Sequence, residues 1–498
     1  MIDLILGLTE LDFQLLGNRN SGTGTGAASF VSDVNEFPVP TSMYNETNLY
    51  RGGVRIERRR FHATLEEGGT TFRDDENLFQ TPGSTNYGNL SAPYLGQTLY
   101  LTSLLSAYGI RGDSTYSKGV FTASPASWID LYGQFLFSQP RTNVNYQQRD
   151  TGNLVLQSQL LFFSSQEYLA TAEAKMPHTT GSAGAEIRPL RHVRIIEEWL
   201  TDRLHDSANS PSTNVLFGPL GQQTASIASL LAASLVTNYN QNQIDIFFDP
   251  TPKLTLRGGY RYVWGSADDG VLPPADLVTS DQAKLRRNVG IGSITFRPTA
   301  KLSLTGEAEG GASGGVYFAT SLYDYQKARA QVRYQATKSL NILGDFDLLK
   351  NQNPTPGINY NFRAVQESFS LLWLPAGGKF GDFQASYSRS DLRSDIDYLE
   401  PESLQPELSA YRDNAHIGSG LFNFKLPHSV KLAAGGSFFI SSGSRPTSYY
   451  QPMGKLTVPF QKHAQLFAEW TYYGYGEAFY LYEGFRTHAV IAGLRLLR

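Results

Sequence analysis

The side chains in this sequence that could do chemistry are charged residues recurring at every second position. In residues 253–265, KLTLRGGYRYVWG, Arg257 and Arg261 fall on one side of the alternation, and leucines, tyrosines and a tryptophan fall on the other. Successive side chains of a strand point to opposite faces. The segment therefore predicts a strand with one apolar, aromatic face and one charged face.

The same alternation recurs in residues 301–309, 327–334, 341–348 and 465–472. Their polar faces carry ten charged side chains, which we call the lumen set: Arg257, Arg261, Glu307, Glu309, Lys327, Arg329, Arg333, Asp345, Asp347 and Glu469. Such charges could bias the ion selectivity of a pore or grip a protein threaded through it. The alternative is that they pair with one another across neighbouring strands.

Other chemistries find little support. The chain has no cysteine, which excludes disulfides, thiolate zinc sites and covalent c-type haem within it. Its eight histidines show no metal-ligand spacing, so we predict no metal site. One GxSxG match, GASGG at 311–315, centres on Ser313, but the strand-like VYFAT follows it where a nucleophile elbow needs a helix. We predict a Gly-rich loop there, no catalytic residue and no enzyme.

Two further segments suggest contacts. Residues 55–62, RIERRRFH, form a basic cluster at an expected turn, either solvated or in contact with anionic headgroups or a periplasmic partner. Residues 213–240 are apolar and compatible with a helix, although they fall where an external loop is expected. We expect a loop helix packed on the barrel rim; an inward constriction or a docking surface is the alternative.

Composition narrows the class. The chain has 498 residues, 47 glycines, 12% aromatic and 17% charged residues, and a net charge of −3. A balance this close to neutral does not suggest a nucleic-acid surface. No apolar run reaches the roughly 18 residues that a transmembrane helix requires. A transmembrane barrel remains compatible with the sequence, because its strands alternate apolar and polar residues and need no long apolar run.

Hairpins repeat along the chain. Short turns containing Pro, Lys or Gly lie at 124–128, 188–192, 249–253, 297–301, 335–339, 375–379, 426–430 and 459–463. Longer polar connections lie between them, at 265–283, 350–360 and 390–410. Short turns alternating with long loops are typical of outer-membrane barrels. We therefore predict an all-β fold: an antiparallel transmembrane β-barrel of roughly 22 strands (range roughly 18–26), with short periplasmic turns and long extracellular loops.

We expect residues 1–49 to form an N-terminal segment, with a first strand plus loop, and residues 50–498 to form the barrel. The first residues, MIDLILGL, lack a signal-peptide pattern, and the last strand ends in Arg498 where such barrels typically end in an aromatic residue. The expected location is integral to the bacterial outer membrane, in contact with its lipid.

The chain resembles bacterial outer-membrane barrels of porin-like type. Its cysteine-free body, its many strands and hairpins such as FRPTAKLSLTGEAEG also resemble the sleeve barrels of porin–cytochrome conduits. That resemblance implies a barrel that binds no cofactor itself and holds a multihaem c-type cytochrome as partner, the haem being carried by the partner. The expected function is passage across the outer membrane, as a channel or as such a sleeve. The alternatives are a barrel enzyme and an adhesion or structural barrel.

Overall fold

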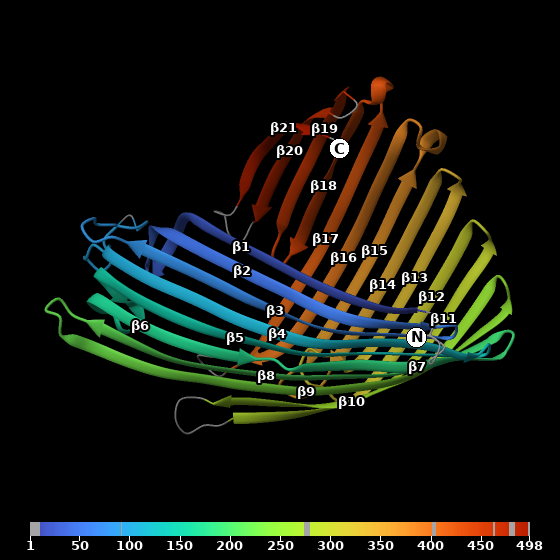
Figure 1. The fold of residues 1–498 in the computed structure, drawn as a ribbon, viewed down its shortest axis with the longest axis horizontal. Coiled ribbons are helices and arrows are strands. Elements are labelled where there is room, and N and C mark those ends of the chain that lie inside the picture. Colours follow the sequence, from blue (N-terminus) through green and yellow to red (C-terminus); the bar gives the residue numbers. More distant parts are fainter. Residues whose placement is uncertain are drawn as a thin grey trace. The chain divides into compact units, whose positions relative to one another are not determined.

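The computed structural model describes residues 10–90, 92–272, 279–400, 405–461, 464–477 and 484–496. Throughout these residues the regular structure is strand, interrupted only by short 3₁₀ turns (Figure 1). No described helix is long and apolar enough to cross a bilayer.

Within the described residues the sheet has 21 strands, and the consecutive strands whose cross-strand partners are known run antiparallel. The first ten are β1 (Glu10–Ser32), β2 (Asn35–Arg58), β3 (Phe61–Gln80), β4 (Tyr100–Ala126), β5 (Ile129–Leu156), β6 (Leu161–Lys175), β7 (His178–Leu190), β8 (Val193–Phe217), β9 (Gln223–Thr251) and β10 (Leu254–Leu272). The others are β11 (Thr279–Thr299), β12 (Leu302–Gly315), β13 (Asp324–Thr337), β14 (Leu340–Asn353), β15 (Tyr360–Trp373), β16 (Gly381–Leu399), β17 (Pro406–Lys425), β18 (Lys431–Gly443), β19 (Thr447–Gln461), β20 (Ala464–Glu477) and β21 (Phe485–Leu496). The 3₁₀ turns are η1 (Gln157–Gln159), η2 (Pro375–Gly378) and η3 (Pro427–Ser429).

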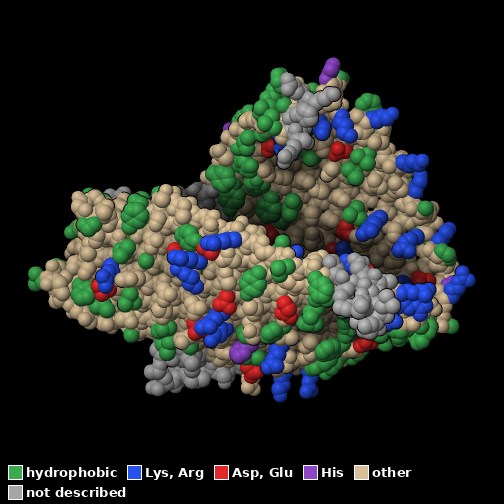
Figure 2. Space-filling model, viewed as in Figure 1, with side chains coloured by type: hydrophobic (Ala, Val, Ile, Leu, Met, Phe, Trp, Pro, Cys, Tyr) green, Lys and Arg blue, Asp and Glu red, His purple; other side chains and the backbone are tan. Residues whose placement is uncertain are grey.

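The predicted strands and turns are confirmed. Each of the five alternating segments lies almost entirely within one strand, and each of the eight short turns joins two strands. Positive φ angles occur in these turns, as at Gly377 (+67°) and Gly378 (+81°), where glycine relieves the steric penalty. Figure 2 shows Lys and Arg side chains gathered along the edge where the turns of β11–β18 lie.

Strands β6 and β7 together form a single pass through the sheet. β5 pairs with both β6 and β7, while β8 pairs with β6. Between β6 and β7, the Met176 amide donates to the Pro140 carbonyl and the His205 amide donates to the Pro177 carbonyl, both at 3.0 Å. Pro177 has no N–H, so the ladder is interrupted there without a change of direction. The described strands therefore make twenty passes, an even number, as single-chain bacterial barrels have.

The chain divides into two compact units. Unit 1 comprises residues 1–186, 198–242 and 264–284, and unit 2 comprises residues 187–197, 243–263 and 285–498. Unit 1 contains a hydrophobic cluster in which Phe37, Leu101 and Leu154 are at most 1% exposed. Unit 2 contains a smaller cluster of Val289, Ile291 and Tyr325.

The long connections predicted from sequence are built largely as extensions of the strands. β10 continues to Leu272 and β11 begins at Thr279, so most of 265–283 is paired strand. In the same way β16 continues to Leu399 and β17 begins at Pro406. The position where we expected the barrel to begin, residue 50, lies within β2, which pairs with β1 along its length.

The expected helix in residues 213–240 is wrong. The segment is the end of β8, a five-residue connection and the beginning of β9. Alanine and leucine favour helices only weakly, by tenths of a kcal/mol per residue, and pairing with a neighbouring strand outweighs that preference. Ile227, Leu230 and Leu231 are exposed there, at 40%, 47% and 61%.

Candidate functional site: the cavity face of strands β12–β19

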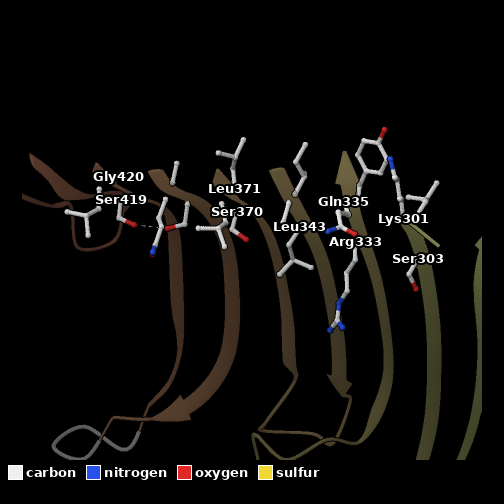
Figure 3. A pocket seen from close by; sticks show the side chains of 18 of the residues that line it. Lys301, Ser303, Arg333, Gln335, Leu343, Ser370, Leu371, Ser419 and Gly420 are labelled. Atoms are coloured by element: carbon white, nitrogen blue, oxygen red, sulfur yellow. Dashed lines mark hydrogen bonds between the residues drawn. The ribbon is translucent and has the colours of Figure 1, made fainter. Parts of the chain in front are cut away.

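The register of unit 2 aligns eight side chains, six of which carry a hydroxyl or an amide, into one row across eight strands. Each member is the direct cross-strand partner of the next, and we call the set the serine row: Ser303, Arg333, Leu343, Ser370, Ser386, Ser419, Ser437 and Gln451. All eight line a cavity of about 1400 Å³ (Figure 3). Side chains alternate along a strand, and we call the face of β12–β19 that carries the row the cavity face.

The serine row is polar and nearly uncharged. The hydroxyls of Ser386 and Ser419 lie 2.7 Å apart, joined by the dashed line in Figure 3. The Ser437 hydroxyl donates to Oε1 of Gln451 over 3.4 Å. Hydroxyl and amide groups both donate and accept hydrogen bonds. The row can therefore exchange hydrogen bonds with water or with a polar solute.

Seven members of the lumen set share this face on β12–β14. Glu307 is opposite Arg329, which is opposite Asp347, and Glu309 is opposite Lys327. On its own strand, each of these residues and Asp345 lies an even number of positions from the member of the serine row, so its side chain is on the same face. Arg333 belongs to the row itself. The sequence prediction that these charges share one face is thus confirmed by the register. That the face lines a membrane pore stays a prediction.

The two arginines of β10 pair within unit 2. Arg257 donates from Nε and Nη2 to both carboxylate oxygens of Asp245, at 2.9 and 3.0 Å, and lies 3.3 Å from Glu307. The Arg257 and Asp245 side chains are 20% and 8% exposed. Arg261 pairs with Glu309 and donates to the Tyr325 hydroxyl over 3.2 Å. These arginines are held by carboxylates of the sheet, as expected if the charges pair with one another between strands.

The last lumen-set residue, Glu469, lies directly opposite Lys455 and pairs with it at 2.6 Å. Arg329 lies 3.8 Å from Asp345 and 3.7 Å from Asp347 and is 53% exposed, so it keeps access to solvent. Sequence reasoning missed Asp245 and Lys455, although both fall on the polar side of alternating segments. Only the register shows which arginine or glutamate each of them meets.

The remaining candidates do not form a reactive centre. Ser313 lies within β12, and its hydroxyl donates to the Leu322 carbonyl over 3.3 Å, so the GxSxG match is no strand-to-helix elbow. Of the eight histidines, His178 has its Nε2 atom 2.8 Å from a carboxylate oxygen of Asp202. The described residues include no group of three or more His, Asp or Glu placed to hold a metal ion. The basic segment 55–62 does form the turn between β2 and β3, at Arg59 and Arg60.

The face opposite the cavity is apolar near the short turns. Leu340, Trp373, Phe383 and Phe422 are aligned there in one row, and Phe369 follows on β15. Trp373, Phe369 and Phe422 are 45%, 45% and 41% exposed. An exposed apolar face backed by a polar one is what a sheet in lipid requires.

Comparisons with known proteins agree with this picture. No protein-family model matches the chain, and no curated protein matches it. Solved structures do: the siderophore receptor PiuA from Acinetobacter baumannii has a TM-score of 0.52 at 12% identity, with 97% of this chain and 81% of that chain covered. The chain has the fold of an outer-membrane β-barrel. The fold and its apolar face make the protein integral to the bacterial outer membrane, in contact with lipid.

Two other structures give the same fold. The ferric yersiniabactin uptake receptor FyuA from Yersinia pestis has a TM-score of 0.51 at 9% identity, with 97% of this chain and 78% of that chain covered. The ferric citrate transporter FecA in the unliganded form has a TM-score of 0.50 at 11% identity, with the same coverages. The predicted count of roughly 22 strands agrees with the 21 observed.

Proposed function

We propose that this protein is a porin-like channel through which small polar solutes cross the outer membrane. The observation that carries the proposal is the serine row, which places an unbroken line of hydroxyl and amide groups on the cavity face of β15–β19. A solute that leaves bulk water there exchanges its hydrogen bonds with water for hydrogen bonds with the wall, so the row lowers the cost of passage.

The number of passes supports the same proposal. Barrels of about eight strands are filled by their own side chains, whereas barrels of 16 strands or more leave an aqueous lumen or hold a plug. Twenty passes belong to the second group. Water, a segment of protein or both must therefore occupy the lumen.

The charges of the cavity face favour a weakly selective channel. Cations and anions are interspersed there, and Arg257, Arg261 and Lys455 are already paired with carboxylates of the sheet. A ring of one sign would impose strong ion selectivity, but paired charges of both signs largely cancel.

A sleeve for a haem-carrying cytochrome is the second candidate, because a lumen of this strand number has room for a protein. The internal pairing of the lumen set favours the channel, since a wall that grips a protein would offer its charges to that protein.

The first experiment is purification from the native outer membrane in mild detergent, with a visible spectrum of the fraction. A colourless single chain that gives single-channel conductance in planar bilayers supports the channel. A strong haem band with a co-purifying cytochrome refutes it in favour of the sleeve. A folded, colourless chain without conductance refutes both.

Variants of Ser370 then test whether the serine row lines the conducting path. Ser370→Lys and Ser370→Asp should shift the cation-to-anion permeability ratio in opposite directions, by roughly twofold to fivefold, since a unit charge about 4 Å from an ion in water is worth about 1 kcal/mol. Ser370→Asn, similar in size but neutral, is the control and should leave the ratio unchanged. Identical selectivity in all three would remove the row from the path.

A further inference from the structure

A second row of aligned side chains lies on the face opposite the cavity, on β14–β17, near the ends distant from the short turns. Its four members are direct cross-strand neighbours of one another and all are cations; we call them the outer cation row: Lys350, Arg363, Arg393 and Arg412. Like charges directly opposite one another destabilise a sheet. Four such charges in sequence therefore imply a source of negative charge beside them.

The sheet itself supplies only part of that charge. Arg412 donates two hydrogen bonds to the carboxylate of Asp395, at 2.6 and 2.8 Å, and Arg393 donates to Asp391 over 3.4 Å. In the described part of the chain, no ion pair involves Lys350 or Arg363, and both are exposed. Half of the row therefore faces outward with its positive charge uncompensated by the protein.

The position of the row relates it to the membrane. On β14 the chain takes ten residues from Leu340 to Lys350, and on β15 it takes ten from Arg363 to Trp373. At about 3.3 Å per residue and a tilt near 40°, ten residues rise about 25 Å. That rise equals the apolar band of an outer-membrane barrel. If Trp373 lies at the inner interface, Lys350 and Arg363 lie at the outer one, at headgroup level.

The side chains between the two rows agree with this placement. On β14 and β15 the outward face is apolar at Phe346, Leu348 and Val365, up to the cations. The exception is Glu367, which lies opposite Arg389 in the register, so its charge faces one of opposite sign. On β14 the apolar band therefore ends where the outer cation row begins, whereas on β16 charged side chains begin earlier on this face, at Arg389 and Asp391.

We propose that the outer cation row binds the phosphate groups of the phosphorylated glycolipid that forms the outer leaflet of the bacterial outer membrane. Guanidinium groups bind phosphate through two parallel hydrogen bonds, and lysine binds it as a point charge. The acyl chains of the same lipid would cover the apolar band directly below. This site is distinct from the cavity face and does not depend on which solute or partner the lumen takes.

The test measures binding of bisphosphorylated lipid A to the purified full chain in neutral detergent by native mass spectrometry. The variant Lys350→Gln/Arg363→Gln removes the two uncompensated cations. Each cation near an anionic lipid surface contributes roughly fivefold, so we expect about 25-fold weaker binding. Lys301→Gln/Lys338→Gln, two exposed cations at short turns, is the matched control and should bind as the unaltered protein does.

Three results would overturn the proposal. The Lys350/Arg363 variant, shown to be folded by its circular dichroism, could bind lipid A as tightly as the unaltered chain. The control variant could lose as much affinity, which would make the attraction non-specific. Millimolar inorganic pyrophosphate could displace lipid A completely, which would make the row a site for free phosphate and not for lipid.

Discussion

Asp150 offers a stringent test of the packing in unit 1. It lies on β5 opposite Leu104 and is 1% exposed. Among the described residues its Oδ1 atom has no hydrogen-bond donor, and its Oδ2 atom has only the Gln148 amide at 3.4 Å. β5 has 28 residues and Asp150 is near the end farthest from its short turn, whereas about ten residues cross a membrane. Asp150 therefore belongs to the extension beyond the bilayer.

Burial raises the pKa of Asp150 to about 7, from an ordinary value of 3.8. Once this segment opens, the carboxyl regains its ordinary pKa. Between about pH 4 and pH 7 the opened state carries the charge and the folded state retains the proton, so the free energy of opening falls as pH rises. The fall is about 1.4 kcal/mol per pH unit and about 4 kcal/mol in all. Above pH 7 both states are charged and the curve becomes flat.

The variant that tests this is Asp150→Asn, which removes the titratable carboxyl group and keeps the size and shape of the side chain. Hydrogen exchange of the amides of β4 and β5, followed from pH 5 to pH 8 and corrected for intrinsic rates, measures the free energy of local opening. We expect the unaltered protein to lose about 3 kcal/mol between pH 5 and pH 7, and the variant to show no such slope. Parallel curves for the two proteins would refute the reasoning, because the slope would then come from other groups.

Two further predictions concern unit 2. Arg257→Met should destabilise the folded barrel by about 3 to 5 kcal/mol, because Asp245 is left buried and charged. Urea unfolding in detergent measures this loss. Adding Asp245→Asn should restore most of the lost stability, and no restoration would contradict the pairing of the two residues. Gly381→Ala should lower the stability by about 1 to 3 kcal/mol in the same assay, because the φ of Gly381 is +126° and a Cβ would meet the Asn423 carbonyl. The control is Gly357→Ala, where φ is +80° and the space around the glycine is open. An equal loss of stability in the control would show that the close contact at Gly381 adds nothing.

Alternation along the chain was enough to predict the strands of unit 2. Segments such as 301–309 and 327–334 place apolar and charged residues on opposite faces whatever their partners are. The turns could also be predicted from local sequence, because proline restricts and glycine widens the range of backbone dihedral angles at specific turn positions. The charged residues that share one face of these strands could therefore be named from sequence alone.

Pairing between distant residues was not accessible in this way. Residues 213–240 have helix-compatible composition, yet they are strands because β8 pairs with β6 and with β9. Pro177 interrupts a strand without ending the pass, which only the pairing of β5 with both β6 and β7 shows. Asp150 likewise lies opposite Leu104, a member of a cluster assembled from β1, β2, β4, β5, β6 and β8.

The sequence by itself determined that this protein is a barrel of alternating strands with charges on one face, because the direction of a side chain repeats every two residues. The tertiary structure decided which charges meet. Register joins Arg257 to Asp245, aligns the serine row across eight strands and sets Lys350 beside Arg363. Register is a relation between strands, fixed by where every turn falls and by the packing of both faces, and the alternation within any single strand does not contain it.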